Sequence, residues 1–229
     1  MLAISRAQVR EVDRMAIEDY SVPGIVLMEN AGRNASEAII ANFDSVSEQD
    51  FVVVVGPGNN GGDGFVIARY LELTGARVRV VLAAPPNRLK GDSLTNFKIV
   101  TQSGIEVLCL VGAPEECWQS VLVSATCVID AILGTGGSGA IRGDSKNAID
   151  SIAERMKITP RPFIIAIDVP SGFDCDHGAT DGNCIRADTT LTFVASKQGF
   201  HATDANQYIG KVQVIDIGVP QAVRAHCGL

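Results

Sequence analysis

Short apolar segments alternate with helical patterns along most of this 229-residue chain, and this alternation restricts the fold more than any other feature. Phe51 to Val55 and Phe163 to Ile167 are apolar at every position. Such strands are buried on both faces, which is typical of a parallel sheet with helices on each side. We therefore expect an α/β fold. The pattern predicts strands over residues 51–56, 77–83, 105–109, 127–130, 163–168, 189–194 and 211–216.

Helices are predicted before the first strand and between the strands. Their ranges are 5–19, 25–42, 63–74, 92–102, 114–120 and 145–157. Connections from strand to helix to strand are right-handed crossovers, so the sheet should be mostly parallel. The chain is 46% hydrophobic, which is enough for a sizeable core, and its length suits one α/β domain better than two. We predict a single domain over residues 1–229.

The charge balance and the hydropathy argue against two classes of partner. A net charge of −7 disfavours nonspecific binding to nucleic acid or anionic membranes, because both depend on clustered Lys and Arg. No segment approaches the roughly 20 apolar residues of a membrane span. The six cysteines have no C-x-x-C spacing, so reduced thiols and a cytoplasmic location are expected. Pairing of Cys175 with Cys184 across a loop is the alternative.

A glycine-rich segment follows the strand over 51–56. It reads Gly56-Pro57-Gly58-Asn59-Asn60-Gly61-Gly62-Asp63-Gly64. Three of its glycines match G-x-G-x-x-G, a pattern in which backbone N–H groups at a helix N-terminus hold a pyrophosphate. Asp63 would repel a phosphate bound there, and no acidic residue ends the strand over 77–83 to hold a ribose. The segment therefore indicates a nucleotide site of an unusual kind.

Two more loops with polar residues follow predicted strands. They are Asp130-Ala131-Ile132-Leu133-Gly134-Thr135-Gly136-Gly137-Ser138-Gly139 and Asp168-Val169-Pro170-Ser171-Gly172. Ligands of open parallel sheets bind beyond the carboxyl ends of the strands, where all three loops should meet. An Asp after a strand often only caps the next turn. Two such residues, with Asn60 and Asp63 in the same crevice, favour a site.

Several side chains in these loops have two possible roles. Asn60, Asp130 and Ser171 offer the oxygen atoms that suit a hard cation, and their low formal charge favours a monovalent one. An ordinary network of hydrogen bonds between loops is the alternative. Residues 134–140 could form a nest of N–H groups for phosphates, or a flexible surface loop. Lys197 follows the strand over 189–194 and could reach the crevice or remain exposed.

Five motifs together resemble the YjeF N-terminal-domain family, the NAD(P)H-hydrate epimerases. They are Met28-Glu29-Asn30-Ala31-Gly32, the glycine-rich segment Gly56 to Gly64, Asp130-Ala131-Ile132-Leu133-Gly134-Thr135-Gly136, Asp168-Val169-Pro170-Ser171-Gly172, and Ala187-Asp188-Thr189-Thr190-Leu191-Thr192-Phe193. The resemblance extends from about Ile4 to Pro220. It implies a Rossmann-like three-layer αβα sandwich with a mostly parallel central sheet, and a homodimer.

The resemblance also implies an activity and its site. Family members interconvert the R and S epimers at C6 of the hydrated cofactors NADHX and NADPHX, so that an S-specific dehydratase can restore NAD(P)H. Because this chain stops without a fused dehydratase domain, a separate dehydratase is expected as its functional partner. One potassium ion per subunit would be held by Asn60, Asp130 and Ser171. The substrate would contact Asn59, Asn60, Gly61, Gly62, Asp63, Gly134, Thr135, Gly136, Gly137, Ser138, Gly139, Ala140 and Asp168.

The chemistry of the hydrate indicates which groups the reaction needs. The lone pair of the ring nitrogen expels the C6 hydroxyl once an acid protonates it, and water then adds to the opposite face. We predict Asp168 as the acid/base residue, with Lys197 and Asn30 as orienting groups. A conventional NAD-dependent dehydrogenase would need a ribose-binding acid and a hydride-transfer partner, and neither is found. A noncatalytic nucleotide- or protein-binding module of the same fold is the alternative.

Overall fold

A parallel sheet of seven strands forms the centre of the computed structural model, which describes residues 3–136, 141–180 and 182–229. The strand order is β4-β3-β2-β5-β6-β7-β9, and every neighbouring pair is parallel. The strands are β2 (Asp50–Val55), β3 (Arg77–Leu82), β4 (Glu106–Cys109), β5 (Cys127–Ala131), β6 (Phe163–Ile167), β7 (Thr189–Phe193) and β9 (Lys211–Ile215). The predicted α/β fold with a mostly parallel sheet is confirmed.

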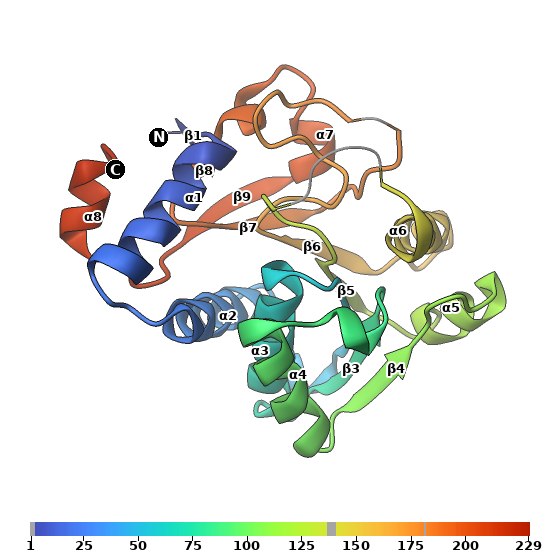
Figure 1. The fold of residues 1–229 in the computed structure, drawn as a ribbon. Coiled ribbons are helices and arrows are strands. Elements are labelled where there is room, and N and C mark those ends of the chain that lie inside the picture. The colour runs from blue at the N-terminus through green and yellow to red at the C-terminus, as the bar shows by residue number, and fades with distance from the viewer. Residues whose placement is uncertain (1–2, 137–140, 181) are drawn as a thin grey trace.

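Helices cover both faces of the sheet, which gives three layers (Figure 1). One face packs against α1 (Arg6–Arg14), α2 (Gly24–Ile40), α3 (Asn59–Glu72), α4 (Gly91–Gln102) and α8 (Gln221–His226). The other face packs against α5 (Glu115–Leu122) and α6 (Gly143–Arg155). A short helix, α7 (Asn206–Ile209), belongs to a smaller apolar cluster with Phe173 and Phe200. The layers follow from the two-sided burial that the apolar strands require.

Strand β2 illustrates how the sequence builds two cores at once. Its side chains alternate, so that Val53 and Val55 join the core under α2 and α3, while Val52 and Val54 join the core under α5 and α6. Each of these valines is at most 1% exposed. Complete burial of one such side chain stabilises the fold by about 1.5–3 kcal/mol. The continuous apolar run is therefore required by burial on both sides.

The order of the strands creates a switch point between β2 and β5. The chain runs outward from β2 through β3 to β4, and then returns to form β5 on the other side of β2. Connections leaving β2 and β5 consequently diverge to opposite faces of the sheet, and a crevice opens between them at the carboxyl ends. The glycine-rich segment follows β2 and the loop from Ile132 follows β5. The topology places both at this crevice.

Most of the glycine-rich segment is helical, which differs from the prediction. We expected a helix from residue 63, whereas α3 begins at Asn59. Close packing explains the glycines, because a methyl group at Gly56 would collide with the carbonyl oxygen of Ile132, and one at Gly61 with the carbonyl oxygen of Gly56. Tertiary packing thus overrides the low helix propensity of glycine. Asp63, which was predicted as the first residue of the helix, therefore lies inside it and not at its start.

The N-terminal segment crosses to the C-terminal part of the chain. Its strand β1 (Ala3–Ile4) pairs in parallel with β8 (Ser196–Lys197), and neither strand was predicted. Ser5 then caps α1 through a capping box with Gln8, and a π-helical turn over Met15–Asp19 continues the helix. Figure 1 shows α1 beside the C-terminal helix α8. This arrangement brings α1 to the end of β7, next to the crevice.

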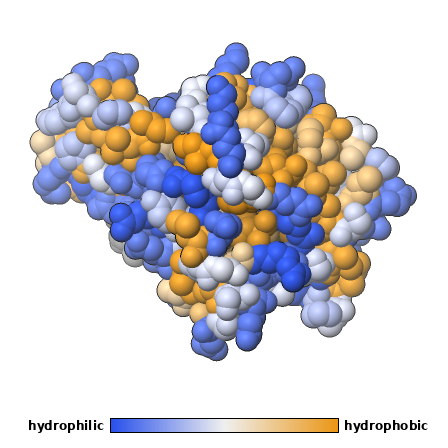
Figure 2. Space-filling model, turned by 90° about the horizontal axis from the view of Figure 1, so that it is seen from below, coloured by the Kyte–Doolittle hydropathy of each residue, from blue (hydrophilic) through white to orange (hydrophobic). Residues whose placement is uncertain are grey.

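Hydrophilic and hydrophobic residues are mixed on the face of the molecule that Figure 2 shows. The large apolar side chains that remain exposed include Leu73, Val123 and Ile158 on separate elements, and Ile17, Tyr20 and Val26 close together in sequence. Within the described residues, we find no helix with the length and apolar character needed to span a bilayer.

Candidate active site

A cavity of about 460 Å³ lies at the switch point, and we call it the acidic cavity. Four carboxylates line it from separate elements: Asp13 of α1, Asp63 of α3, Asp92 of α4 and Asp168 after β6. Apolar side chains form the rest of its wall. They include Leu27, Met28, Ala31, Phe193 and Val194. A cavity lined by carboxyl groups and apolar side chains suits a flat, uncharged ring that carries polar substituents.

Asp168 and Lys197 form a buried ion pair beside this cavity. Lys197 Nζ lies 3.0 Å from Asp168 Oδ1, and the lysine side chain is 0% exposed. Its ammonium group also donates to Thr192 Oγ1 at 2.8 Å and to the carbonyl oxygen of Phe193 at 2.9 Å. The expectation that Lys197 could remain exposed is wrong. A fully bonded buried ion pair of this kind fixes the orientation of the carboxylate.

Backbone strain accompanies this ion pair. Asp168 and Val194 both have positive φ angles, 63° and 69°, at the ends of the neighbouring strands β6 and β7. A left-handed conformation costs an L-residue about 1–2 kcal/mol, and a β-branched valine adopts it rarely. Hydrogen bonds hold both residues, from Asp168 N to Leu191 O at 2.7 Å and from Val194 N to Ile215 O at 3.2 Å. Strain held in this way is typical of functional sites.

Asp63 and Asp168 have different proton affinities. Burial alone would raise the pKa of Asp168, but Lys197 and the Thr135 N–H, which donates at 3.0 Å, hold that pKa below its ordinary value. Burial, followed by the charges of Asp168 and Asp13, raises the pKa of Asp63 well above its ordinary value. The pKa of Asp168 is therefore lower than that of Asp63, so Asp63 keeps its proton to higher pH than Asp168 does. Environments that separate two pKa values in this way create a base and an acid in one site.

Asp13 is a site residue that the sequence did not indicate. Burial and the charge of Asp168 raise the pKa of Asp13 to about 6. Its helix lies more than 150 residues from Asp168 in the sequence, and only the pairing of β1 with β8 brings it to the cavity. No local motif marks an aspartate on an amphipathic helix as a ligand. The charged face of α1, which also carries Arg10 and Arg14, has the pattern of an ordinary solvated surface.

The predicted potassium ligands meet around the segment 132–134. Asp130 is fully buried and accepts hydrogen bonds from Ser171 Oγ at 2.6 Å, Ser171 N at 2.8 Å and Ile132 N at 3.2 Å. Ser171 Oγ in turn accepts from Leu133 N at 2.9 Å. Asn60 has no hydrogen-bond partner for either atom of its buried carboxamide within the described part of the chain.

This donor set fits a monovalent cation. A carboxylate has about four acceptor positions, so Asp130 keeps one after its three hydrogen bonds. Burial raises the pKa of Asp130 to about 6, and no cationic side chain among the described residues forms an ion pair with it. A cation would lower the cost of that buried charge and would give the Asn60 oxygen a partner. Each of the two alternatives, a cation site and a network of hydrogen bonds between loops, therefore has support. Hydrogen bonds join Asp130 to Ser171, while the Asn60 carboxamide has no hydrogen-bond partner among the described residues.

The predicted substrate-contacting residues lie in two segments, 59–63 and 134–140, and at Asp168, which is described above. Asn59, Asn60, Gly61, Gly62 and Asp63 form the first turns of α3, and Gly58 caps this helix without a side-chain hydrogen bond. Gly134 lies against Asn60 and Asp168, because a Cβ on it would be 3.2 Å from Asn60 Oδ1 and 3.1 Å from Asp168 Oδ2. Thr135 and Gly136 line the acidic cavity. Gly137, Ser138, Gly139 and Ala140 lie outside the described residues.

Asn30 makes a packing contact, and it is not one of the described residues that line the acidic cavity. Its carboxamide nitrogen donates to the carbonyl oxygen of Ile217 at 3.1 Å, and it packs beside Gly218. This hydrogen bond ties α2 to the segment after β9. The hydrogen bond supports the packing alternative for this motif, and the orienting role stays a prediction. The alternative pairing of Cys175 with Cys184 is not formed, since all six cysteines are free, as expected.

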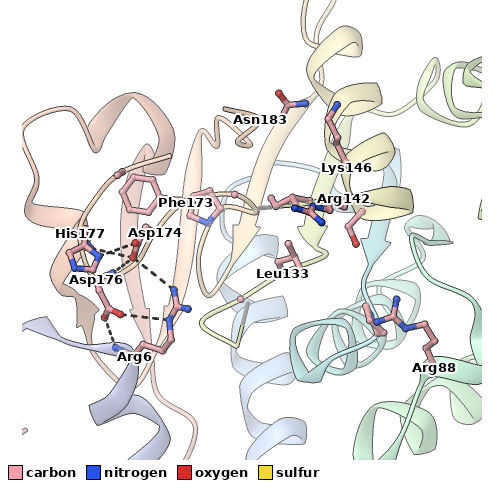
Figure 3. Close-up of a pocket in the computed structure, with 17 residues that line it drawn as sticks. Arg6, Arg88, Leu133, Arg142, Lys146, Phe173, Asp174, Asp176, His177 and Asn183 are labelled. Atoms are coloured by element: carbon pink, nitrogen blue, oxygen red, sulfur yellow. Dashed lines mark hydrogen bonds and ion pairs between the residues drawn. The ribbon is translucent and has the colours of Figure 1, made fainter. Parts of the chain in front are cut away.

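A second cavity of about 570 Å³ adjoins the first, and we call it the basic cavity (Figure 3). The two cavities share Pro57, Leu133 and Gly134. Cationic side chains line the basic cavity from three elements: Arg6, Arg88, Arg142 and Lys146. Arg142 directly follows the segment 134–140 that was considered as a phosphate nest, whereas no local motif marks Arg6, Arg88 or Lys146, which are scattered along the chain.

Comparison with known proteins identifies the family. The family model described as YjeF-related protein N-terminus matches residues 24–199. This chain belongs to that family. A Pirellula staleyi protein named NAD(P)H-hydrate epimerase is 40% identical over 95% of this chain and 93% of its own length. A Rhodopirellula baltica protein of the same name is 40% identical over 93% of this chain and 83% of its own length.

Two further similarities are to a longer relative and to a solved structure. The Moorella thermoacetica protein named bifunctional NAD(P)H-hydrate repair enzyme Nnr is 38% identical over 98% of this chain, which spans 42% of that longer protein. The crystal structure of yeast ynu0 superposes with a TM-score of 0.83 at 23% identity and covers all of this chain and 94% of its own. The fold of this chain is therefore shared with a protein whose sequence has diverged from it.

Proposed function

We propose that this chain is an NAD(P)H-hydrate epimerase that interconverts the R and S forms of NADHX and NADPHX at C6. The observation that carries the proposal is the Asp168 carboxylate, held by Lys197 and Thr135 at the edge of a partly apolar cavity. Relatives with this name align over nearly the whole chain. The reaction needs an acid, a base and a pocket that holds a ring beside water, and the acidic cavity has these parts.

Asp63 and Asp168 have different roles in the proposed reaction. In our mechanism the protonated Asp63 donates its proton to the C6 hydroxyl, which leaves as water while the ring-nitrogen lone pair forms a C=N bond. Water then attacks C6 from the opposite face, and the Asp168 carboxylate takes up its proton. A proton returned through solvent from Asp168 to Asp63 restores the starting state. Lys197 positions Asp168 and does not itself exchange a proton with the substrate.

A potassium ion bound by Asn60, Asp130 and Ser171 is part of the proposal. When bound, it would supply a fixed positive charge beside the buried Asp130. The unsatisfied Asn60 carboxamide and the remaining acceptor position on Asp130 support this assignment. We also propose a homodimer, for which the exposed Ile17, Tyr20 and Val26 offer an apolar surface.

The cellular setting follows from the chemistry. An epimerase restores no NAD(P)H by itself, so a separate S-specific dehydratase must consume its product. Relatives named bifunctional repair enzymes support this coupling, because their names combine the two tasks in one chain. We propose the cytoplasm as the location, and the six free thiols support a reducing compartment.

A coupled assay tests the proposal. A mixture of R and S NADHX is incubated with an S-specific dehydratase, and the R form is followed by chiral chromatography. We expect the R form to persist with dehydratase alone, apart from slow spontaneous epimerisation, and to disappear when this chain is added. Persistence of the R form in the presence of the folded chain would leave a noncatalytic binding module as the better description.

A further inference from the structure

The two adjoining cavities differ in their charge. Four carboxylates and one cationic side chain, Arg10, line the acidic cavity, whereas four cationic side chains and a histidine line the basic cavity. Among the residues that the structure describes, Asp174 and Asp176 are the only carboxylates of the basic cavity. Within a chain of net charge −7, a concentration of cations in one cavity indicates an anionic ligand.

The charges on one side of the basic cavity already neutralise each other (Figure 3). Arg6 lies 3.8 Å from Asp174 and 3.7 Å from Asp176, and its backbone N–H donates to Asp176 at 2.7 Å. His177 Nδ1 contacts Asp174 at 2.9 Å. This network ties the N-terminal segment to the loop after β6. It leaves no surplus positive charge for a ligand.

The surplus positive charge lies on the other side. Arg88 follows β3 and Arg142 precedes α6, and neither guanidinium has a hydrogen-bonded or ion-paired partner among the residues that the structure describes. Lys146, one turn into α6, forms its ion pair with Asp150. Arg88 also lines a shallow recess with Pro57 and Gly58, just before the start of α3. Two unpaired arginines on separate elements thus face one cavity.

The residues that border both cavities indicate how one dinucleotide can occupy the two cavities at once. Pro57, Leu133 and Gly134 border each of them, and Gly134 also touches Asn60 and Asp168. The reacting ring belongs beside Asp168, in the cavity with the apolar wall. The remainder of an extended dinucleotide then passes Gly134 into the basic cavity. Arginine suits the phosphate groups of that remainder, because its planar guanidinium donates two hydrogen bonds to a pair of phosphate oxygens.

We infer that the basic cavity is the site for the adenosine half of the substrate, with Arg88 and Arg142 binding its phosphate groups. This inference rests on the proposed function for the identity of the ligand. The adenosine side carries one diphosphate phosphate in NADHX and an additional 2′-phosphate in NADPHX. Both are anionic phosphate esters. Arg88 and Arg142 therefore determine affinity for the dinucleotide, while Asp63 and Asp168 carry out the chemistry.

Direct binding tests the inference without catalysis. ADP-ribose and 2′-phospho-ADP-ribose lack the nicotinamide ring, and calorimetry measures their affinity for the full chain. We expect Arg88→Gln and Arg142→Gln each to weaken binding at least about 10-fold, as expected for loss of a charge-assisted hydrogen bond. Lys211→Gln is the matched control, because Lys211 begins β9 at the opposite edge of the sheet and is exposed. Its affinity should equal that of the wild type.

Kinetics with a truncated substrate complete the test. Hydrated reduced nicotinamide mononucleotide lacks the adenosine half, so the double variant should epimerise it like the wild type. With NADHX or NADPHX, the same variant should show a raised KM and an unchanged kcat. A larger effect on NADPHX identifies a contact to the 2′-phosphate, and equal effects identify the diphosphate; both support the inference.

Two results separate failure of the inference from failure of the proposed function. Unchanged affinity of the double variant for both ADP-ribose probes, or an equal loss with the truncated substrate, overturns the role of the basic cavity. A wild-type chain that binds ADP-ribose through these arginines but epimerises none of the three hydrates overturns the proposed function alone.

Discussion

The acidic and basic cavities share a wall but have opposite electrostatics. In the acidic cavity, burial and neighbouring carboxylates raise the pKa of Asp63, while Lys197 holds the pKa of Asp168 below its ordinary value. In the basic cavity, the cationic side chains of Arg88 and Arg142 come from separate elements. Crowded groups of one sign serve proton transfer, whereas separated permanent charges serve binding. The chain keeps the two tasks on opposite sides of Gly134.

The largest expected effect is a loss of catalysis without a loss of affinity for ADP-ribose. Asp168→Asn should lower kcat by about 10²–10⁴-fold, the range typical of a lost acid/base group. The variant should also be less stable, since an unpaired buried Lys197 costs about 3–5 kcal/mol. Its affinity for ADP-ribose should be unchanged. Steady-state kinetics, urea unfolding and calorimetry measure the three quantities.

The double variant Asp168→Asn with Lys197→Met controls for stability. It removes both charges together, so the free energy of unfolding should recover while the activity should not. Epimerisation at the wild-type rate by this variant would show that the ion pair is only structural.

Loss of the proposed acid should have the next largest effect. Asp63→Asn should reduce kcat about 10²-fold, because an amide cannot protonate the leaving hydroxyl. Burial raises the pKa of Asp63, so wild-type activity should fall at high pH, where the proton is lost. The variant should lack this alkaline decline in the pH profile of kcat. A profile that keeps the decline would assign the acid to another group.

Asp13 distinguishes stability from activity within the acidic cavity. The pKa of its carboxyl group is raised to about 6, so ionisation destabilises the folded state and stability falls as pH rises from 3.8 to about 6. Asp13→Asn should therefore raise the free energy of unfolding by about 1–2 kcal/mol at pH 7. The gain should vanish below pH 3.8, the ordinary pKa. Urea unfolding across this pH range measures it.

Asp44→Asn is the matched control for Asp13, because Asp44 is exposed in the loop before β2. It should leave stability unchanged at both ends of the pH range. An equal gain in the two variants would mean that net charge, and not the acidic cavity, determines the effect.

The smallest expected effect concerns the cation. Replacing potassium chloride with tetramethylammonium chloride at equal ionic strength should lower Tm by about 2–4 °C, which corresponds to about 1 kcal/mol for a chain of this size. The difference should disappear in Asn60→Ala. It should also fade as pH falls through about 6, where Asp130 takes up a proton. Identical melting curves in the two salts would remove potassium from the site.

The sequence by itself determined the layers and much of the candidate site. Apolar runs such as Phe163 to Ile167 can only be buried on both faces, and so they specified strands of a parallel sheet. Ligands of such a sheet bind beyond the carboxyl ends of its strands, so the sequence also predicted that the loops after β2, β5 and β6 form the candidate site. Asp63, Asp130 and Asp168 follow from that rule. The five ordered motifs identified the family.

Tertiary structure alone decided the features that depend on distant segments. Asp13 reaches the cavity because β1 pairs with β8, and Lys197 is buried for the same reason. Helix α3 begins at Asn59 because Gly56 and Gly61 allow close packing against the loop after β5. Arg88 and Arg142 come together only when β3 and α6 are placed in the fold. Burial and electrostatic fields are sums over neighbours in space, and no local pattern in a sequence contains those neighbours.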